Sequence, residues 1–413
     1  MAERPLTIAV VGAGIAGIAA AHFLARRHQV TLYEAANTLG GHARALAVDD
    51  GAGGTVPVDT GFLIFNEETY PLFMQLLGEL GVSDRVMRAE MSASFSDEGR
   101  DLHYAMNRGT YALFHGFRNA MRPGFYRMFA EVLLFRRRAA RDLAAGRIGT
   151  ATLGEYLAGY SDLLRENFIL PLAACIWSLP PRHVFSYPAA TILRFFDNHR
   201  LLSDRGTRAW RTFRGSSSVY VDAFRRAWRG TLRTGARATL IQRDDRGVTV
   251  HAGGAERFDR VVLATHADTA LALLEQPTPA ESELLGAWTY HANTVLLHTD
   301  ASVLHPDRRL WASWNYRAGR AGPVISYHLN RVQALSGCRD LFLSLTEGGV
   351  AEDRILDRQQ LTHPVFDARA VATQTRLASL NGERGTYYCG SYFGHGFHED
   401  AVRSATEVAR RLS

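Results

Sequence analysis

Residues 7–34 read Thr-Ile-Ala-Val-Val-Gly-Ala-Gly-Ile-Ala-Gly-Ile-Ala-Ala-Ala-His-Phe-Leu-Ala-Arg-Arg-His-Gln-Val-Thr-Leu-Tyr-Glu, and this stretch decides the fold. An apolar run typical of a strand ends at Val11. Gly12, Gly14 and Gly17 follow it and lead into an alanine-rich helical segment. At this spacing Gly12 permits a tight turn, Gly14 lets the backbone approach a pyrophosphate, and Gly17 lets helix and strand pack closely. The N–H groups at the start of the helix favour phosphate. The stretch therefore predicts a dinucleotide-binding unit.

Two features downstream of the fingerprint refine this prediction. Glu34 ends a second strand-like run and is the first acidic residue after the glycines, where a carboxylate accepts hydrogen bonds from a ribose. Gly40 and Gly41 would let a second loop approach the same cofactor. Simple binding of NAD is disfavoured by this second glycine loop.

The remaining sequence changes character along the chain. Residues 104–230 look mostly helical and are rich in aromatic side chains, whereas residues 231–265 contain successive strand-like runs. Residues 288–346 continue with strand-like alternation. The chain closes with a strand-like run, a glycine-rich turn and a helix that starts near Glu399 or Asp400. A length of 413 residues suggests about two domains.

The charge is unevenly distributed along the chain. Residues 100–229 hold 21 Arg against 9 Asp and Glu, a net charge of +12, although the whole chain carries only +6. Such asymmetry suggests an anionic partner. Nucleic acid is not expected, because no recognised binding motif accompanies the charge.

A basic amphipathic segment lies inside this region, at residues 125–141. It is apolar on one side and ends in a cluster of arginines, so it would suit an anionic membrane surface. An ordinary helix that packs on the core and has a solvated arginine end fits the same pattern. Both interpretations stay open.

Cysteine and lysine usage exclude several classes of protein. The three cysteines are scattered and no Cys/His ligand spacing appears, so neither a disulfide framework nor a metal site is expected, and the chain fits a reducing cytoplasm. All 47 basic residues are arginine, so a lysine Schiff base is excluded. No segment suggests a signal peptide or a membrane span. We expect a cytoplasmic chain, peripheral at the inner face of the membrane if the basic segment docks there.

The motifs together resemble the flavin-containing amine oxidase superfamily, which includes phytoene-desaturase-type enzymes. The matching features are the fingerprint with Glu34, the glycine pair, Asp59-Thr60-Gly61, the strand at 260–266, and Gly390-Ser391 with the helix that follows. A narrower resemblance is to a bacterial branch of NAD/FAD-binding proteins linked with fatty-acid modification. Its marks are Gly41-His42, Ile176-Trp177-Ser178, Phe195 to His199, Trp210 to Ser217, Ser313 to Tyr316, and Gly396 to Asp400.

The resemblance implies FAD as the cofactor and an α/β fold (α+β with two domains). It implies a Rossmann-like, GR2-type FAD-binding domain formed by residues 1–66, 205–275 and 385–413. Residues 67–204 and 276–384 would form a substrate domain of mixed sheet with a basic helical cap. The oligomeric state is left open.

Site residues follow from the resemblance position by position. The cofactor contacts expected are Gly12, Gly14, Ile15, Ala16, Gly17, Glu34, Ala35, Gly40, Gly41, His42, Gly61, Phe62, Ala238, Gly390, Ser391, Asp400, Ala401 and Val402. The substrate pocket is expected to include Phe65, Trp177, Phe196, Trp314 and Tyr327. The catalytic candidates are His395, His398, Tyr316 and Asn315, the histidines because neutral imidazole can act as a base near pH 7. A purely structural role is the alternative for each of them.

The predicted function is an FAD-dependent oxidoreductase that moves a hydride from a C–H bond of an apolar, fatty-acyl or other lipid substrate to the flavin. The alternatives are a non-redox isomerase, an oxidase of a small amine or other hydrophobic metabolite, and a membrane-docked flavoprotein scaffold. Amine oxidases proper keep a lysine near flavin N5, and this chain has none, which counts against amine oxidation.

Overall fold

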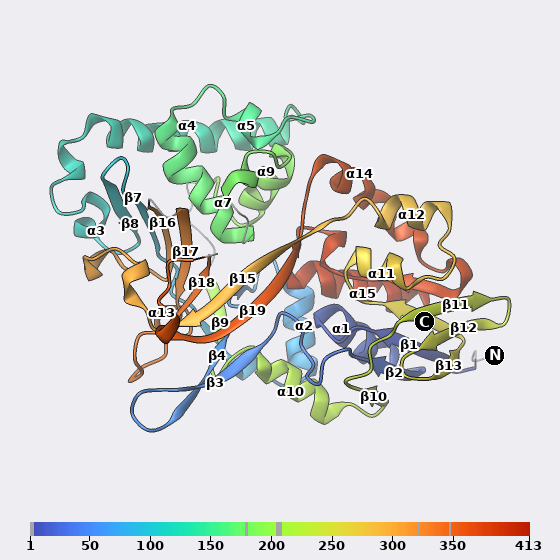
Figure 1. Ribbon diagram of the computed structural model, residues 1–413. Helices are drawn as coiled ribbons and strands as arrows, with labels where there is room; N and C mark the ends of the chain where they lie inside the picture. The colour runs from blue at the N-terminus through green and yellow to red at the C-terminus, as the bar shows by residue number, and fades with distance from the viewer. Residues whose placement is uncertain (1–3, 178–180, 204–208, 320–321, 347) are drawn as a thin grey trace.

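The computed structural model describes residues 4–177, 181–203, 209–319, 322–346 and 348–413. The predicted domain limits at residues 1, 204 and 205, and Ser178 of the motif at 176–178, lie outside these ranges. The α/β prediction is confirmed, because the chain combines many helices with several β-sheets (Figure 1).

The fingerprint lies in a parallel sheet of five strands. Their spatial order is β10 (Thr231–Arg233), β2 (Gln29–Tyr33), β1 (Thr7–Val11), β14 (Arg260–Leu263) and β20 (Thr386–Tyr388). Four of the five residues of β1 are buried, which matches the continuous apolar run expected of a central parallel strand. The strands come from all three ranges predicted for the FAD-binding domain.

Helices and a small sheet surround these strands. The helices are α1 (Ile15–Leu24), α2 (Pro71–Glu79), α10 (Ser218–Ala227), α11 (Ala267–Leu273), α12 (Pro279–Leu285), α14 (Ala368–Leu377) and α15 (His398–Arg411). The small sheet has β11 (Leu240–Asp244), β12 (Gly247–His251) and β13 (Ala255–Phe258). Helix α1 packs on α15, so the two ends of the chain meet beside the parallel sheet (Figure 1).

A second sheet of seven strands forms the other half of the molecule. Its order is β19 (Ile355–Pro364), β15 (Tyr290–His298), β18 (Phe342–Leu345), β17 (Gly322–His328), β16 (Trp314–Gly319), β7 (Ala93–Asp97) and β8 (Leu102–Met106). Neighbours are antiparallel except for β16 and β7. The long strands β15 and β19 run from this sheet toward the first half (Figure 1).

Shorter strands connect the halves. The hairpin is β3 (Ala45–Asp49) with β4 (Thr55–Asp59), and α13 (Leu329–Val332) follows β17. A small sheet joins β5 (Phe65–Asn66), β9 (Trp210–Phe213) and β6 (Val86–Arg88).

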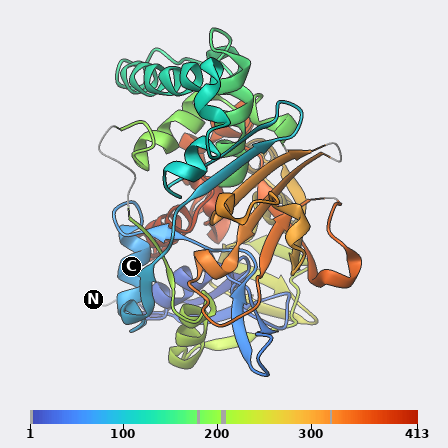
Figure 2. The same ribbon diagram turned by 90° about the vertical axis from the view of Figure 1, so that its left-hand side faces the viewer.

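The helical cap is the middle of the chain. It contains α3 (Thr110–Phe114), α4 (Pro123–Ala144), α5 (Leu153–Tyr156), α6 (Asp162–Leu164), α7 (Leu170–Trp177), α8 (Pro181–Val184) and α9 (Ala189–Asn198). Helix α4 buries Phe125, Met128, Val132, Phe135 and Ala139, whose spacing of three and four residues makes one apolar face. Figure 2 shows this helix at the outer edge of the molecule, far from the chain termini.

Candidate functional site

The glycine fingerprint forms the floor of the site. Gly12 has a φ of +98°, and its N–H donates to the Tyr33 carbonyl at 2.8 Å, which fixes the turn after β1. A Cβ at Gly14 would meet no protein atom within 4 Å, so this position faces open space. A Cβ at Gly17 would lie 1.8 Å from the Gly12 carbonyl oxygen. Gly14 thus keeps room for a ligand, whereas Gly17 keeps room for the protein itself.

A second loop closes on the fingerprint, as the glycine pair predicts. The Gly40 N–H donates to the Ala13 carbonyl at 2.8 Å, and a Cβ at Gly41 would lie 3.2 Å from the Gly14 Cα. Nearby, a Cβ at Gly61 would lie 2.2 Å from the His42 carbonyl oxygen. Glycine is therefore required wherever these backbones meet.

The Glu34 carboxylate lies beside this loop. It accepts hydrogen bonds from the backbone N–H groups of Ala13 and Ala36, each at 2.8 Å. These bonds hold the carboxylate at the rim of the cavity, and its contact with a ribose stays a prediction.

One cavity of about 800 Å³ extends from the fingerprint to the cap. This size is within the range of ligand pockets in proteins. Fifteen of the predicted cofactor residues line it: Gly12, Gly14, Ile15, Ala16, Glu34, Ala35, Gly40, Gly41, His42, Gly61, Phe62, Ala238, Gly390, Ser391 and Ala401.

Three of the predicted cofactor residues do not line the cavity. Gly17 packs against the Gly12 turn, and Val402 is fully buried in the core beside α1. Asp400 accepts hydrogen bonds from the N–H groups of His395 and Phe397, and from Arg403, so its carboxylate caps the start of α15. Each of these three residues lies behind the cavity surface, and its contact with the cofactor stays a prediction.

The apolar end of the cavity comes from the cap and the large sheet. Trp177, Trp314 and Tyr327 line it as predicted. The Tyr327 hydroxyl donates to the Cys175 carbonyl at 2.8 Å and so joins β17 to α7. The rings of Trp314 and Tyr327 meet edge to face, with centroids 5.6 Å apart.

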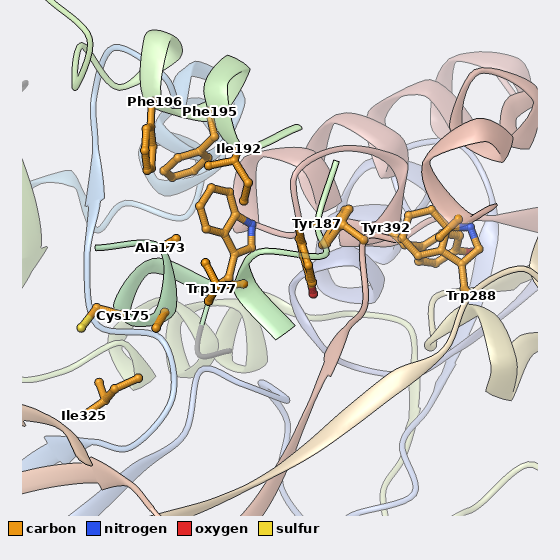
Figure 3. Close-up of a cluster of buried hydrophobic side chains, with 14 of the residues drawn as sticks. Ala173, Cys175, Trp177, Tyr187, Ile192, Phe195, Phe196, Trp288, Ile325 and Tyr392 are labelled. Carbon is orange, nitrogen blue, oxygen red and sulfur yellow. The ribbon is translucent and has the colours of Figure 1, made fainter. Parts of the chain in front are cut away.

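The other two predicted pocket residues belong to the core. Phe65 is packed among Phe62, Phe73 and Phe213 and has no exposed surface. Phe196 points into the core of the cap, and its neighbour Phe195 lines the cavity instead, with its ring centroid 4.6 Å from that of Trp177. Figure 3 shows Trp177 beside the side chains of α9.

Of the four catalytic candidates, His398 alone lines the cavity. The side chain of Asn315 is taken up by backbone groups of Ala312 and Ser326. Tyr316 lies further along β16, paired with Ile325 and Phe95 in the core. His395 uses its backbone to accept from Trp177 and donate to Asp400. None of these three residues lines the cavity, and their catalytic roles stay predictions.

His398 is held by two contacts. Its ring stacks on Phe62 with centroids 3.5 Å apart, and its Nε2 lies 3.1 Å from the Tyr220 hydroxyl. Burial, followed by the nearby His42, lowers the pKa of His398 to about 3. The imidazole is therefore neutral at pH 7.

A group of three histidines that sequence reasoning largely missed lies at the same cavity. His363 of β19 and His266 after β14 flank His42, with ring centroids 5.2 and 6.3 Å from it. Burial lowers the pKa of His42 to about 4 and, with the two neighbouring histidines, that of His363 to about 3. His266 ends the strand-like run at 260–266, so its position carried a signal, whereas only tertiary pairing brings His363 here.

The lining fits FAD by its charges and its unpaired polar atoms. Among the described residues that line the cavity, the charged ones are Glu34 and Arg237, both at the fingerprint end, where the Ala236 N–H donates to the Glu34 carbonyl. Four buried polar atoms at the cavity have no hydrogen-bond partner among the described residues: His42 Nε2, Trp210 Nε1, Trp314 Nε1 and the Tyr392 hydroxyl. Buried polar atoms normally have partners, so these indicate a ligand with polar groups.

Three comparisons place this arrangement among known proteins. A family model described as flavin containing amine oxidoreductase matches residues 15–332. A 15-cis-phytoene desaturase of Capsicum annuum is 39% identical over 94 residues. That match covers 22% of this chain and only 15% of the relative's own length.

Solved structures share the fold over the whole chain. A fatty acid isomerase from P. acnes has a TM-score of 0.72 at 15% identity and covers 98% of both chains. Cyclohexylamine oxidase from Brevibacterium oxydans IH-35A has a TM-score of 0.71 at 14% identity and covers 99% of both. At these identities the likeness shows the fold alone. The family resemblance seen in the sequence is confirmed, whereas its narrower bacterial branch stays a prediction.

Proposed function

This chain belongs to the flavin containing amine oxidoreductase family, and on that basis we propose that it oxidises an apolar acyl chain. Family membership makes it a flavin-dependent oxidoreductase with FAD as its cofactor. Bound FAD supplies the hydride-accepting chemistry. The protein binds and orients the substrate and excludes water.

The composition of the cavity is the observation that carries the substrate class. Its cap end is lined by apolar and aromatic side chains such as Trp177, Phe195 and Trp314, and the described carboxylate that lines the cavity is Glu34, at the opposite end. A protonated amine would lose its hydration there without gaining an ion pair, which costs several kcal/mol, about as much as burying any unpaired charge. An acyl chain has no charged group to desolvate there, and burial of each CH₂ group stabilises the complex by about 0.8 kcal/mol.

Product analysis after a single turnover tests this proposal without knowing the electron acceptor. Holoenzyme in excess is mixed anaerobically with a long-chain fatty acid, and the molecular mass of the recovered lipid is measured by mass spectrometry. Loss of two hydrogens is expected. Recovery of an isomer of equal mass would favour the isomerase alternative, which would use the same cavity. Recovery of unchanged lipid together with conversion of a hydrophobic amine would contradict the acyl substrate.

We also propose that the outer face of the cap docks on anionic membranes. Six large apolar side chains of α3, α4 and the segment between them are exposed: Tyr111, Phe117, Met121, Tyr126, Leu133 and Leu134. Phe117 and Met121 are 86% and 82% exposed. Exposed apolar surface of this kind often marks a site of contact with a membrane or another protein. Arg118, Arg127 and Arg137 are exposed among them. Helix α4 packs on α9, whose Phe195 lines the cavity, so a docked face would bring lipid close to the site.

Vesicle sedimentation tests this docking. The double variant Phe117→Ser/Met121→Ser is expected to lose binding to phosphatidylglycerol vesicles while single-turnover activity on dispersed fatty acid is kept. Leu356→Ser is the control, because Leu356 is a 40% exposed apolar residue on β19, outside the cap. Equal binding by the variant and the parent, or equal binding to neutral vesicles, would contradict the proposal. Docking without turnover on any lipid would instead favour a scaffold.

A further inference from the structure

A second cavity, of about 860 Å³, lies on the far side of one wall of the flavin cavity. It is lined by Arg88, Glu90, Asn107, Trp210, Asn330 and Arg331, among others. Trp210 lines both cavities and is only 8% exposed. The two spaces therefore share the Trp210 indole as a common wall.

The second cavity carries an excess of positive charge. Arg331 Nη1 lies 3.1 Å from Glu90 Oε2, and Arg108 Nη1 lies 3.8 Å from Glu90 Oε1. Among the described residues, the lining itself holds the guanidinium groups of Arg88 and Arg331 and the carboxylate of Glu90, whereas Arg108 pairs with Glu90 from outside the lining. The Glu90 carboxylate also accepts from the Ser92 hydroxyl at 2.7 Å. One carboxylate thus serves two close arginines and cannot neutralise both.

Two arginines beside Glu90 keep a nitrogen atom without a partner. The Nε atoms of Arg108 and Arg331 are buried and have no hydrogen-bond partner in the part of the chain that the structure describes. Burial, and then the charge of Arg331, lower the pKa of Arg108, which shows that the two cations repel each other. A carboxylate accepts two parallel hydrogen bonds from a guanidinium, so an anion beside Arg331 would offset the excess of positive charge.

The flavin cavity supplies the complementary observation. Its charged lining residues, Glu34 and Arg237, lie at the fingerprint end, so an acidic head group has no cationic partner at the apolar end. An amphiphile whose chain enters the apolar end must place its head group elsewhere. The second cavity, here called the arginine cavity after Arg88 and Arg331 in its lining, lies across Trp210. Its excess of positive charge is opposite in sign to the charge of an acidic head group.

We propose that the arginine cavity binds the terminal carboxylate of the acyl substrate, whose chain passes Trp210 into the flavin cavity. The proposal rests on the proposed function and narrows its substrate to free long-chain carboxylic acids. Neutral esters and alcohols of the same chain length fit the flavin cavity but lack the group that Arg88 and Arg331 recognise.

Ligand titration of the holoenzyme, followed by tryptophan fluorescence, tests the site. A long-chain fatty acid is expected to bind at least about tenfold more tightly than its methyl ester, because hydrogen bonds to a charged group are stronger than those to a neutral one. Arg331→Gln and Arg88→Gln are expected to remove this preference and leave ester binding unchanged. The control is Arg369→Gln, because Arg369 is exposed on α14, away from both cavities.

The Glu90→Gln variant should change the affinity for the acid in the opposite direction from the arginine variants. Removing the competing carboxylate is expected to tighten acid binding severalfold, whereas a purely structural Arg–Glu cluster would lose stability and leave acid binding unaffected. FAD content shows that each variant is folded.

The outcomes separate this proposal from the proposed function. Equal affinity for acid and ester, or an acid preference that survives both arginine variants, would overturn the carboxylate site and leave the acyl substrate standing. Preference for an acyl phosphate over the acid would also overturn it. Failure of both acid and ester to bind would overturn the proposed function itself.

Discussion

Gly14 and Gly17 lie one helical turn apart but serve different purposes. The space beside Gly14 is open, and the space beside Gly17 is filled by the Gly12 carbonyl. The same distinction separates Glu34, which lines the cavity, from Asp400, which caps a helix behind it. At the scale of single residues, what decides a role is the atom that each position faces.

Alanine substitution at the two glycines should therefore have different effects. Gly14→Ala is expected to fold normally but to bind FAD at least about tenfold more weakly, a loss of about 1.4 kcal/mol. Gly17→Ala is expected to lower the thermal unfolding temperature, because its Cβ has no room. Flavin absorbance per protein and thermal unfolding of the apoprotein measure the two effects. An apoprotein of Gly14→Ala as unstable as that of Gly17→Ala would refute the distinction.

The buried histidines predict how stability depends on pH. The pKa of His398 is about 3 in the folded protein, against about 6.5 for an unfolded histidine. Below pH 6.5 the unfolded chain therefore binds a proton that the folded chain does not, and the free energy of unfolding falls with falling pH. The slope should approach about 1.4 kcal/mol per pH unit for this residue. Denaturant titrations of the parent and His398→Gln between pH 7 and 5 should differ by that slope, and parallel curves would speak against it.

At the scale of elements, the sequence predicts what is local and misses what depends on orientation. Gly12, Gly14 and Glu34 are placed by one strand-turn-helix unit, so their spacing is sufficient. Phe195 and Phe196 are neighbours on α9, and amphipathic spacing alone does not show which one faces the cavity. His363 reaches the site because β19 pairs with β15 in the large sheet, and no local pattern reports that pairing.

One buried ion pair links strand β11, helix α12 and strand β20. Arg243 of β11 donates two hydrogen bonds to Glu281 of α12, at 2.5 and 3.0 Å, and the Tyr388 hydroxyl of β20 donates to the same carboxylate at 2.5 Å. The side chains of Arg243 and Glu281 are 1% and 0% exposed. Each element therefore depends on a charge that has no access to water.

Removing the cation should be strongly destabilising. Arg243→Met is expected to lower the free energy of unfolding by about 3–5 kcal/mol, because Glu281 is left as an unpaired buried charge. Urea unfolding measures the change. The matched control is Arg376→Met, which breaks the exposed pair with Glu283 between α14 and α12 and should change little. A similar small change in both variants would contradict this role of the buried pair.

At the scale of the whole molecule, the parts form one path. The parallel sheet presents the fingerprint, and the large sheet lies beside it under the helical cap (Figure 1). One cavity extends from the fingerprint to the apolar end that the large sheet and the cap enclose. The family and the cofactor could be predicted from the sequence because several motifs agree. The arginine cavity could not, because Glu90 and Arg331 come from separate segments that only the fold brings together.

The central claim is that this cavity presents an acyl chain to the flavin for oxidation. It is tested most directly by the absorption band of the holoenzyme near 450 nm, roughly where oxidised flavins absorb, after anaerobic addition of a long-chain fatty acid. Bleaching of the band is the predicted result, with an alkylamine of equal chain length giving little change. A band that stays unchanged with the fatty acid but bleaches with the amine would contradict the account.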